Sequence, residues 1–309
     1  MLKKKQTIQL FRDIYLEYID EMYFNNSKMT PNFYYIALNP GNYTFYFSTN
    51  ISNLESLEQM FYYVENVISI SFTSKFDTKN IKTMEKLFSN CISLISLNIS
   101  NFNTENLENM NTMFENARSL KLLNISNFDT SKVTNMGSLF YYCQSLTSLN
   151  VANLNTSKVR DINSMFCGCS SLISIDISNF DTSQVTNMKY LFAYCISLTS
   201  INISSLNTSK VINMDSIFSG CSSLTSIDLS NIDTSQVTKM NSFFSGCISL
   251  TSINISNLNT SKVIDMNSMF KNCISLTSIV LSNLDTSQVI EMDNLFFDFI
   301  SINSIIFQI

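Results

Sequence analysis

Large apolar residues recur along most of this chain at intervals of 26 residues. One such position is held by Phe88, Phe114, Phe140, Phe166, Phe192, Phe218, Phe244, Phe270 and Phe296. Methionine follows the same step four residues earlier, with Ile162 in the one remaining place. A period of this length predicts a solenoid, in which each repeat buries its apolar face only against its neighbours.

Each repeat contains the signature of one short strand. In the unit from 127 to 152, NFDTSKVTNMGSLFYYCQSLTSLNVA, alternation directs Leu149 and Val151 inward together with Leu146. Ser148 and Asn150 then point outward. Stacking these strands about 4.8 Å apart predicts a long parallel sheet along one face of the solenoid.

The first half of the same unit predicts a short helix. Val133, Met136, Phe140 and Cys143 fall at offsets of 0, 3, 7 and 10, which is one face of a helix. Asp129 precedes them and is suited to accept a hydrogen bond from a backbone N–H two or three residues on. The expected fold class is therefore α/β, a solenoid of 26-residue coils with one parallel strand and one short helix per coil.

The first 50 residues predict a cap for the open end of the array. Apolar residues at three- and four-residue steps, Ile8, Phe11, Tyr15, Tyr18 and Met22, predict an amphipathic helix over roughly the first 24 residues. The segment from 32 to 47 reads as two aromatic-rich strands joined by a turn at 39–42. We therefore expect a helix and hairpin cap over 1–50 and a repeat solenoid over 51–309. No C-terminal cap is expected, and the last coil could contact a second copy of the chain.

Composition excludes several chemistries. The 309 residues include no histidine, so no Ser-His-Asp triad and no histidine metal ligand can form. The formal charge of −5 is small and scattered, which argues against nucleic acid as a partner. Charged residues such as Arg12 and Asp13 interrupt the only candidate for a signal peptide, and no stretch is long and apolar enough for a transmembrane helix. We expect no enzyme activity, no cofactor and no metal.

Cysteine recurs three residues after the phenylalanine. The position is held by Cys91, Cys143, Cys169, Cys195, Cys221, Cys247 and Cys273. Ala117 and Phe299 replace it in other repeats, so the position tolerates apolar side chains and is expected to face the core as a packed, free thiol. Cys167 adds a lone C-x-C with Cys169 that no other repeat shares, and a zinc site is disfavoured.

The outward positions of the strands are the candidate ligand face. They are Ser148, Asn150, Ser174, Asp176, Ser200, Asn202, Ser226, Asp228, Ser252 and Asn254. Such polar rows could bind a ligand along the face or could simply be hydrated, and calcium is a weaker alternative because the repeats that bind it in calcium solenoids are missing. In the following turn, Asp and Asn alternate from 103 to 285, and Lys and Gln alternate from 158 to 288. This order indicates that the duplicated unit was two coils long.

Units such as NFDTSQVTNMKYLFAYCISLTSINIS, residues 179–204, closely resemble the BspA-type leucine-rich repeats. More narrowly, they resemble a Mycoplasma-type surface-protein repeat of undefined role. The resemblance covers residues 76–307 and implies a leucine-rich-repeat-like solenoid, often on cell surfaces, that acts in adhesion or protein binding without catalytic residues. The first hypothesis is therefore a non-enzymatic scaffold for a protein or matrix ligand, and the alternative is a structural protein that assembles through its C-terminal coil. The location stays open, because the resemblance suggests the cell surface while no signal peptide is visible.

Overall fold

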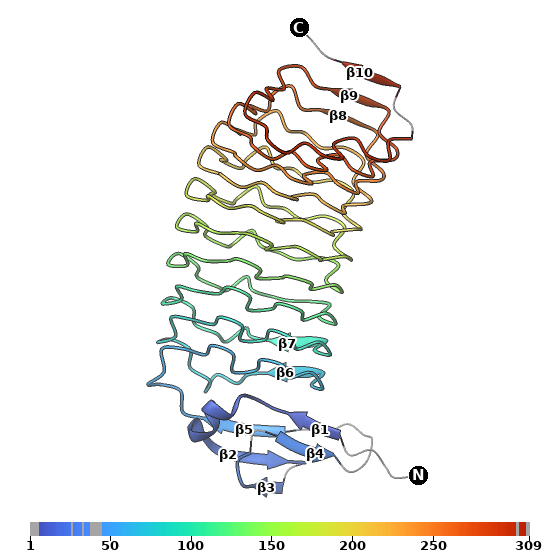
Figure 1. The fold of residues 1–309 in the computed structure, drawn as a ribbon. Coiled ribbons are helices and arrows are strands. Elements are labelled where there is room, and N and C mark those ends of the chain that lie inside the picture. The colour runs from blue at the N-terminus through green and yellow to red at the C-terminus, as the bar shows by residue number, and fades with distance from the viewer. Residues whose placement is uncertain (1–5, 26, 33, 38–44, 301–302, 307–309) are drawn as a thin grey trace, which may run out of the picture.

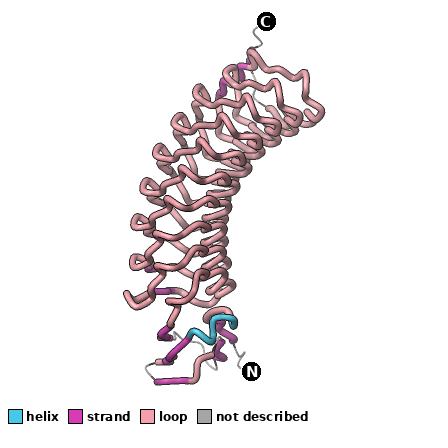
Figure 2. Tube along the Cα trace, turned by 90° about the vertical axis from the view of Figure 1, so that its left-hand side faces the viewer, coloured by secondary structure: helices cyan, strands magenta, loops and turns pink. Residues whose placement is uncertain are grey.

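The structure is a computed structural model that describes residues 6–25, 27–32, 34–37, 45–300 and 303–306. A small β unit at the N-terminus is followed by a long stack of coils that reaches the C-terminus (Figure 1). The stack bends along its length, and most of each coil is neither helix nor strand (Figure 2). We name each coil by its inward phenylalanine, from the Phe61 coil to the Phe296 coil.

The N-terminal unit consists of five short strands and one 3₁₀ helix. They are β1 (Gln6–Gln9), η1 (Asp13–Tyr18), β2 (Ile19–Phe24), β3 (Ser27–Met29), β4 (Tyr34–Ala37) and β5 (Phe45–Thr49). β1 pairs with β4, while β2 lies between β3 and β5, and every pair is antiparallel. The unit contacts the Phe61 coil through a hydrogen bond of 2.8 Å from the Arg12 N–H to the Met60 oxygen.

The helix expected over the first 24 residues is wrong. Ile8 lies in β1, Tyr15 in the 3₁₀ turn and Met22 in β2, because this aromatic and β-branched segment pairs with strands from further along the chain. The apolar residues of this segment pack in the core without forming a helix, and Phe11 and Met22 are completely buried. The predicted hairpin is also wrong in its pairing, since β4 and β5 pair with β1 and β2, and its turn at 39–42 lies outside the described residues.

The coils are held in register by a row of parallel bridges along one side. Each bridge joins equivalent residues of neighbouring coils just before the methionine position: Ser56, Thr83, Asn109, Asn135, Asp161, Asn187, Asn213, Lys239, Asp265 and Glu291. Strands are restricted to the two ends of the described array. They are β6 (Ser69–Ser71) with β7 (Ser96–Asn98), and β8 (Ser252–Asn254) with β9 (Ser278–Val280) and β10 (Ser304–Ile306). The predicted parallel sheet is therefore confirmed only at these ends.

The short helix expected in every coil is absent from the described coils. In the Phe140 coil the backbone enters the left-handed region at Ser138, with φ of 51°, and again at Tyr142, with φ of 55°. Equivalent residues of the other coils do the same, so the right-handed path is broken at every fourth residue. The apolar offsets are produced by successive turns, which bury Met136, Phe140 and Cys143 as the helical pattern requires.

Backbone N–H groups bond alternately within their own coil and to the next coil, which explains why turns replace a helix. The N–H groups of Leu139, Tyr141 and Cys143 each donate to the carbonyl three residues back. The amides between them donate forward: Ser138 N–H reaches Asn163 O at 2.7 Å, and Phe140 N–H reaches the next coil at 2.9 Å. A helix would use all of these donors within one coil, whereas the turns satisfy them and also bond each coil to the next.

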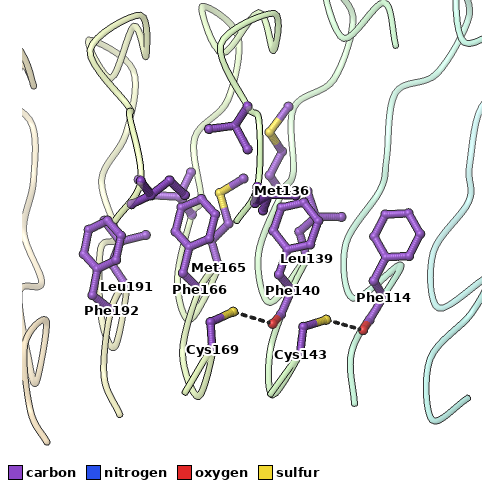
Figure 3. Close-up of a cluster of buried hydrophobic side chains, with 14 of the residues drawn as sticks. Phe114, Met136, Leu139, Phe140, Cys143, Met165, Phe166, Cys169, Leu191 and Phe192 are labelled. Carbon is purple, nitrogen blue, oxygen red and sulfur yellow. Dashed lines mark hydrogen bonds between the residues drawn. The ribbon is translucent and has the colours of Figure 1, made fainter. Parts of the chain in front are cut away.

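The core of the solenoid is a column of phenylalanine rings. Neighbouring rings from Phe61 to Phe296 are nearly parallel, with centroids 5.4 to 6.0 Å apart. Figure 3 shows part of this column beside the cysteines. Each ring buries a large apolar area against the coils on both sides, so the stack stabilises every internal coil.

A second column consists of buried threonines. The Thr130 hydroxyl donates to Asn155 O at 2.9 Å and accepts from the Asn155 N–H at 2.7 Å. Thr78 and Thr260 make the same pair of bonds to the following coil. Each hydroxyl thus satisfies two backbone groups where the chain turns toward its next set of core residues.

Candidate functional site

All ten residues of the candidate ligand face are exposed in the structure. Between them lie buried side chains such as Leu149 and Ile253, so the inward and outward alternation is as the sequence indicates. Only Ser252 and Asn254 belong to a strand, β8, and the other eight occupy equivalent positions in extended coil segments. The face is therefore a polar array fixed on a buried apolar row.

The amide and carboxylate members of this face are already used by the fold. Asn202 accepts the N–H of Ser204 at 3.0 Å, and Asp228 accepts the N–H of Ser230 at 2.9 Å. Asn150, Asp176 and Asn254 make the same Asx turn. These side chains end the extended segment and start the turn, so part of their hydrogen-bonding capacity is not available to a ligand.

Two carboxylates give the face its negative charge. Hydrogen bonds from the Ser178 hydroxyl and N–H lower the pKa of Asp176. The N–H and the hydroxyl of Ser230 likewise lower the pKa of Asp228. Both carboxylates therefore stay ionised at neutral pH, and the asparagines between them keep these charges two coils apart.

The serines of the face have free hydroxyls. Ser148, Ser174, Ser200, Ser226 and Ser252 form a row with one hydroxyl per coil, and none bonds to another described residue. A row of threonines, interrupted by Ile173, precedes it, and the half-buried Thr277 hydroxyl donates to Thr251 O at 3.0 Å. The serine row is thus the part of the candidate face that can make new hydrogen bonds.

Charges beside this face alternate from coil to coil. Asp181 is followed by Gln184 in one coil, and Asn207 by Lys210 in the next. The Lys210 ammonium donates to the Gln184 side-chain oxygen at 2.9 Å, and Lys262 bonds to Gln236 in the same way at 2.7 Å. The alternation keeps equal charges from stacking on adjacent coils, where they would repel.

The cysteine row is confirmed as a set of packed thiols. All eight cysteines are buried and free. The Cys143 thiol donates to Phe114 O at 3.1 Å and the Cys169 thiol to Phe140 O at 3.3 Å (Figure 3). Burial raises the pKa of Cys91, Cys221 and Cys273 to about 12, so these groups are protonated and unreactive at neutral pH.

The part of the chain that the structure describes contains neither a metal-type cluster of side chains nor a membrane-spanning helix. No three Cys, Asp or Glu side chains of this part gather as they would around a metal ion. None of its helices is long and apolar enough to cross a bilayer.

Sequence reasoning missed one surface cluster. Tyr142, Tyr190 and Tyr194 occupy turn positions at which most other coils carry Ser, Gly or Asn, and Tyr141 precedes Tyr142. They were detectable as interruptions of an otherwise regular repeat.

Two crystal structures are similar over most of the chain but at low identity. A leucine-rich cell surface protein of Faecalibacterium prausnitzii A2-165 is 17% identical with a TM-score of 0.32, and covers 78% of this chain and 79% of its own. A leucine-rich repeat protein of Bacteroides ovatus ATCC 8483 is 16% identical with a TM-score of 0.29, and covers 81% and 87%.

No curated protein matches the sequence. A family model, in contrast, matches three overlapping segments, residues 55–172, 145–252 and 213–308. These segments cover nearly all of the coils. The chain therefore belongs to the family described as Mycoplasma protein of unknown function, DUF285.

Proposed function

We propose that this protein is a non-enzymatic repeat scaffold that binds a protein or cell-surface ligand through its candidate ligand face. The observation that carries the proposal is the row of five exposed serine hydroxyls, one per coil, that lack a partner among the described residues. Their positions are fixed because each lies beside a residue that packs in the core or against it. A partner can therefore meet a regular set of donors and acceptors without ordering the scaffold first.

The polar residues of this face repeat from coil to coil, which favours binding over catalysis. An active site needs a unique constellation of groups with different roles, such as a nucleophile, a base and its orienting partner. The absence of histidine from the sequence removes the commonest base. The proposed location is the cell surface, on the basis of the resemblance to surface repeat proteins.

The test is binding to a panel of purified extracellular-matrix proteins, measured by biolayer interferometry. The double variant Ser200→Arg/Ser226→Arg places two large cations on the face, and we expect at least a tenfold loss of affinity. Thr186→Arg is the matched control, because Thr186 is exposed outside the face. Equal losses in both variants, or no binding by the unmodified protein, would contradict the proposal.

A second candidate function is self-assembly through the Phe296 coil. It is favoured by the exposure of large apolar side chains there, with Ile290 exposed by 82% and Ile300 by 79%. Contact with a second copy would bury this surface. Light scattering after size exclusion should then show a dimer that Ile290→Asp/Ile300→Asp converts to a monomer. A monomer at all concentrations for the unmodified chain would exclude this function.

A further inference from the structure

Four tyrosines gather on the turn side of the Phe140 and Phe192 coils. We call Tyr141, Tyr142, Tyr190 and Tyr194 the tyrosine platform. Three of them, Tyr142, Tyr190 and Tyr194, have φ of 55 to 58°, in the left-handed region. Equivalent positions in most other coils carry serine, glycine or asparagine, with Lys86 and Tyr63 among the exceptions, and bulky aromatics are unfavourable in this backbone conformation.

Glycines of the following coils support two of the rings. A Cβ added to Gly168 would lie 2.9 Å from ring carbons of Tyr142, and one added to Gly220 would lie 2.7 Å from the ring of Tyr194. Both glycines have positive φ, 74° and 73°, which is a conformation that glycine adopts readily. Tyr142 and Tyr194 therefore extend over the next coil, along the axis of the solenoid.

Tyr141 and Tyr190 complete the platform. Tyr141 lies against Tyr142 with ring centroids 4.6 Å apart. Burial raises the pKa of Tyr141, and so, to a smaller degree, do its neighbours, with Tyr190 among them. Tyr190 belongs to the Phe192 coil, two coils further on, so the cluster spans the Phe166 coil that lies between.

The platform is available to a ligand. Tyr190 is exposed by 37% and Tyr194 by 51%. None of the four hydroxyls bonds to another described residue. Among the cations of the described residues, the Lys189 ammonium lies against a ring of the platform, 4.7 Å from the Tyr190 centroid. The surface thus combines aromatic faces with free hydroxyls beside two opposite charges, Lys189 and Glu115.

We propose that the tyrosine platform binds an extended, neutral, β-linked polysaccharide, at a site separate from the candidate ligand face. The C–H bonds on the face of a pyranose ring carry positive partial charge and are attracted by the negative face of an aromatic ring. Tyrosine hydroxyls both donate and accept, as sugar hydroxyls do. A neutral chain fits a platform that lies beside one cation, Lys189, and one anion, Glu115.

The spacing of the rings favours an extended chain. Two coil steps separate Tyr142 from Tyr194, and the phenylalanine centroids of these coils are 5.7 and 5.4 Å apart. Aromatic rings two coil steps apart along the solenoid can stack on alternate sugars of an extended glycan. A single sugar would use only one of them, so binding should strengthen with chain length.

The experiment is native affinity electrophoresis in gels that contain hydroxyethyl cellulose, a soluble β-linked glucan. We expect the polysaccharide to retard the protein, and Tyr190→Ser and Tyr194→Ser each to weaken binding at least fivefold. Tyr194→Phe should keep most of the binding, because it preserves the ring face. Tyr46→Ser is the matched control, since Tyr46 is exposed by 57% on β5, outside the platform.

Other outcomes would overturn the proposal. They are no retardation of the unmodified protein, or an equal loss in Tyr46→Ser. Loss of matrix-protein binding in Tyr194→Ser without any glucan binding would assign the platform to a protein partner instead. Ser200→Arg/Ser226→Arg should leave retardation unchanged, so this proposal can fail or hold independently of the proposed function.

Discussion

At the scale of single residues, the cysteine row shows what a repeat position demands. Ala117 and Phe299 indicate from sequence alone that the position is apolar, and burial confirms it for the seven cysteines. The sequence does not reveal the hydrogen bond from each thiol to a phenylalanine carbonyl of the preceding coil, because the distance depends on how closely the coils stack. The thiol combines a small volume with a weak donor, which explains why this position holds cysteine so often.

Alkaline pH should therefore destabilise the folded protein. The ordinary pKa of a cysteine thiol is 9.0, and in the folded protein the pKa of Cys221 is raised to about 12. Between these values the unfolded chain loses the proton and the folded chain keeps it. The stabilisation is present below pH 9.0 and is lost as pH rises toward 12, by at most about 1.4 kcal/mol per pH unit for each thiol.

Urea unfolding at about pH 8 and about pH 10.5 measures this loss. Cys221→Ala should reduce the pH dependence relative to the unmodified protein, and Ser226→Ala, on the exposed face, should not. An unfolding free energy that is unchanged over the interval would show that the thiols titrate normally in the folded state.

At the scale of elements, the apolar offsets of the first half of a coil fit a helix and a series of turns equally well. Met136, Phe140 and Cys143 face the core in either case, so burial could be predicted and secondary structure could not. The choice is made by backbone groups that bond to the next coil, and those bonds have no signature in side-chain hydrophobicity. The Asx turns could be predicted, because Asp129 and its equivalents accept bonds from residues only two positions on.

The threonine column was not foreseen, although Thr follows the Asp or Asn position in every unit. Its hydroxyls act between coils. Thr130→Val keeps the shape but leaves the Asn155 N–H and carbonyl without their partner, and we expect a loss of about 1–3 kcal/mol in unfolding free energy.

Thr147→Val is the control for Thr130→Val, since Thr147 is exposed in the same coil and should change stability by less than about 0.5 kcal/mol. Denaturant unfolding of the two variants measures the difference in their unfolding free energies. Similar stability in both would mean that water replaces the buried hydroxyl.

At the scale of the whole molecule, the alternation of acidic and basic coils becomes a property of the array. Asp181 with Gln184 and Asn207 with Lys210 are equivalent positions of neighbouring coils, so each coil meets neighbours of different charge. The alternation could be read from the sequence. The hydrogen bond from lysine to glutamine between neighbouring coils is visible only in the structure.

Replacing Gln184 by a cation or by an anion should change the free energy of unfolding in opposite directions. Gln184→Lys completes a row of four consecutive lysines from Lys132 to Lys210, and we expect a loss of a few tenths of a kcal/mol that salt relieves. Gln184→Glu should stabilise the protein at low salt by a similar amount. Melting temperatures at low and high ionic strength measure both effects, and equal shifts in both variants would exclude an electrostatic cause.

The candidate ligand face could be located from sequence, but its chemistry could be predicted only in part. The outward alternation placed Ser200 and Asn202 correctly on the surface, whereas only the structure shows that Asn202 is used in an Asx turn and Ser200 is free. The N-terminal unit was the least predictable part, because the pairing of β2 with β5 joins segments that share no repeat. Tertiary pairing decided the secondary structure there.

The forward hydrogen bonds also bear on the order of synthesis. The amides of Ser138 and Phe140 donate to carbonyls of a coil that the ribosome has not yet made when these residues emerge. A growing chain would therefore always present a row of unfilled donors at its newest turns, as a template for the next coil. At about 5–20 residues per second a coil emerges every few seconds, far longer than a turn needs to form. Translation itself should then build the solenoid one coil at a time, starting from the N-terminal unit.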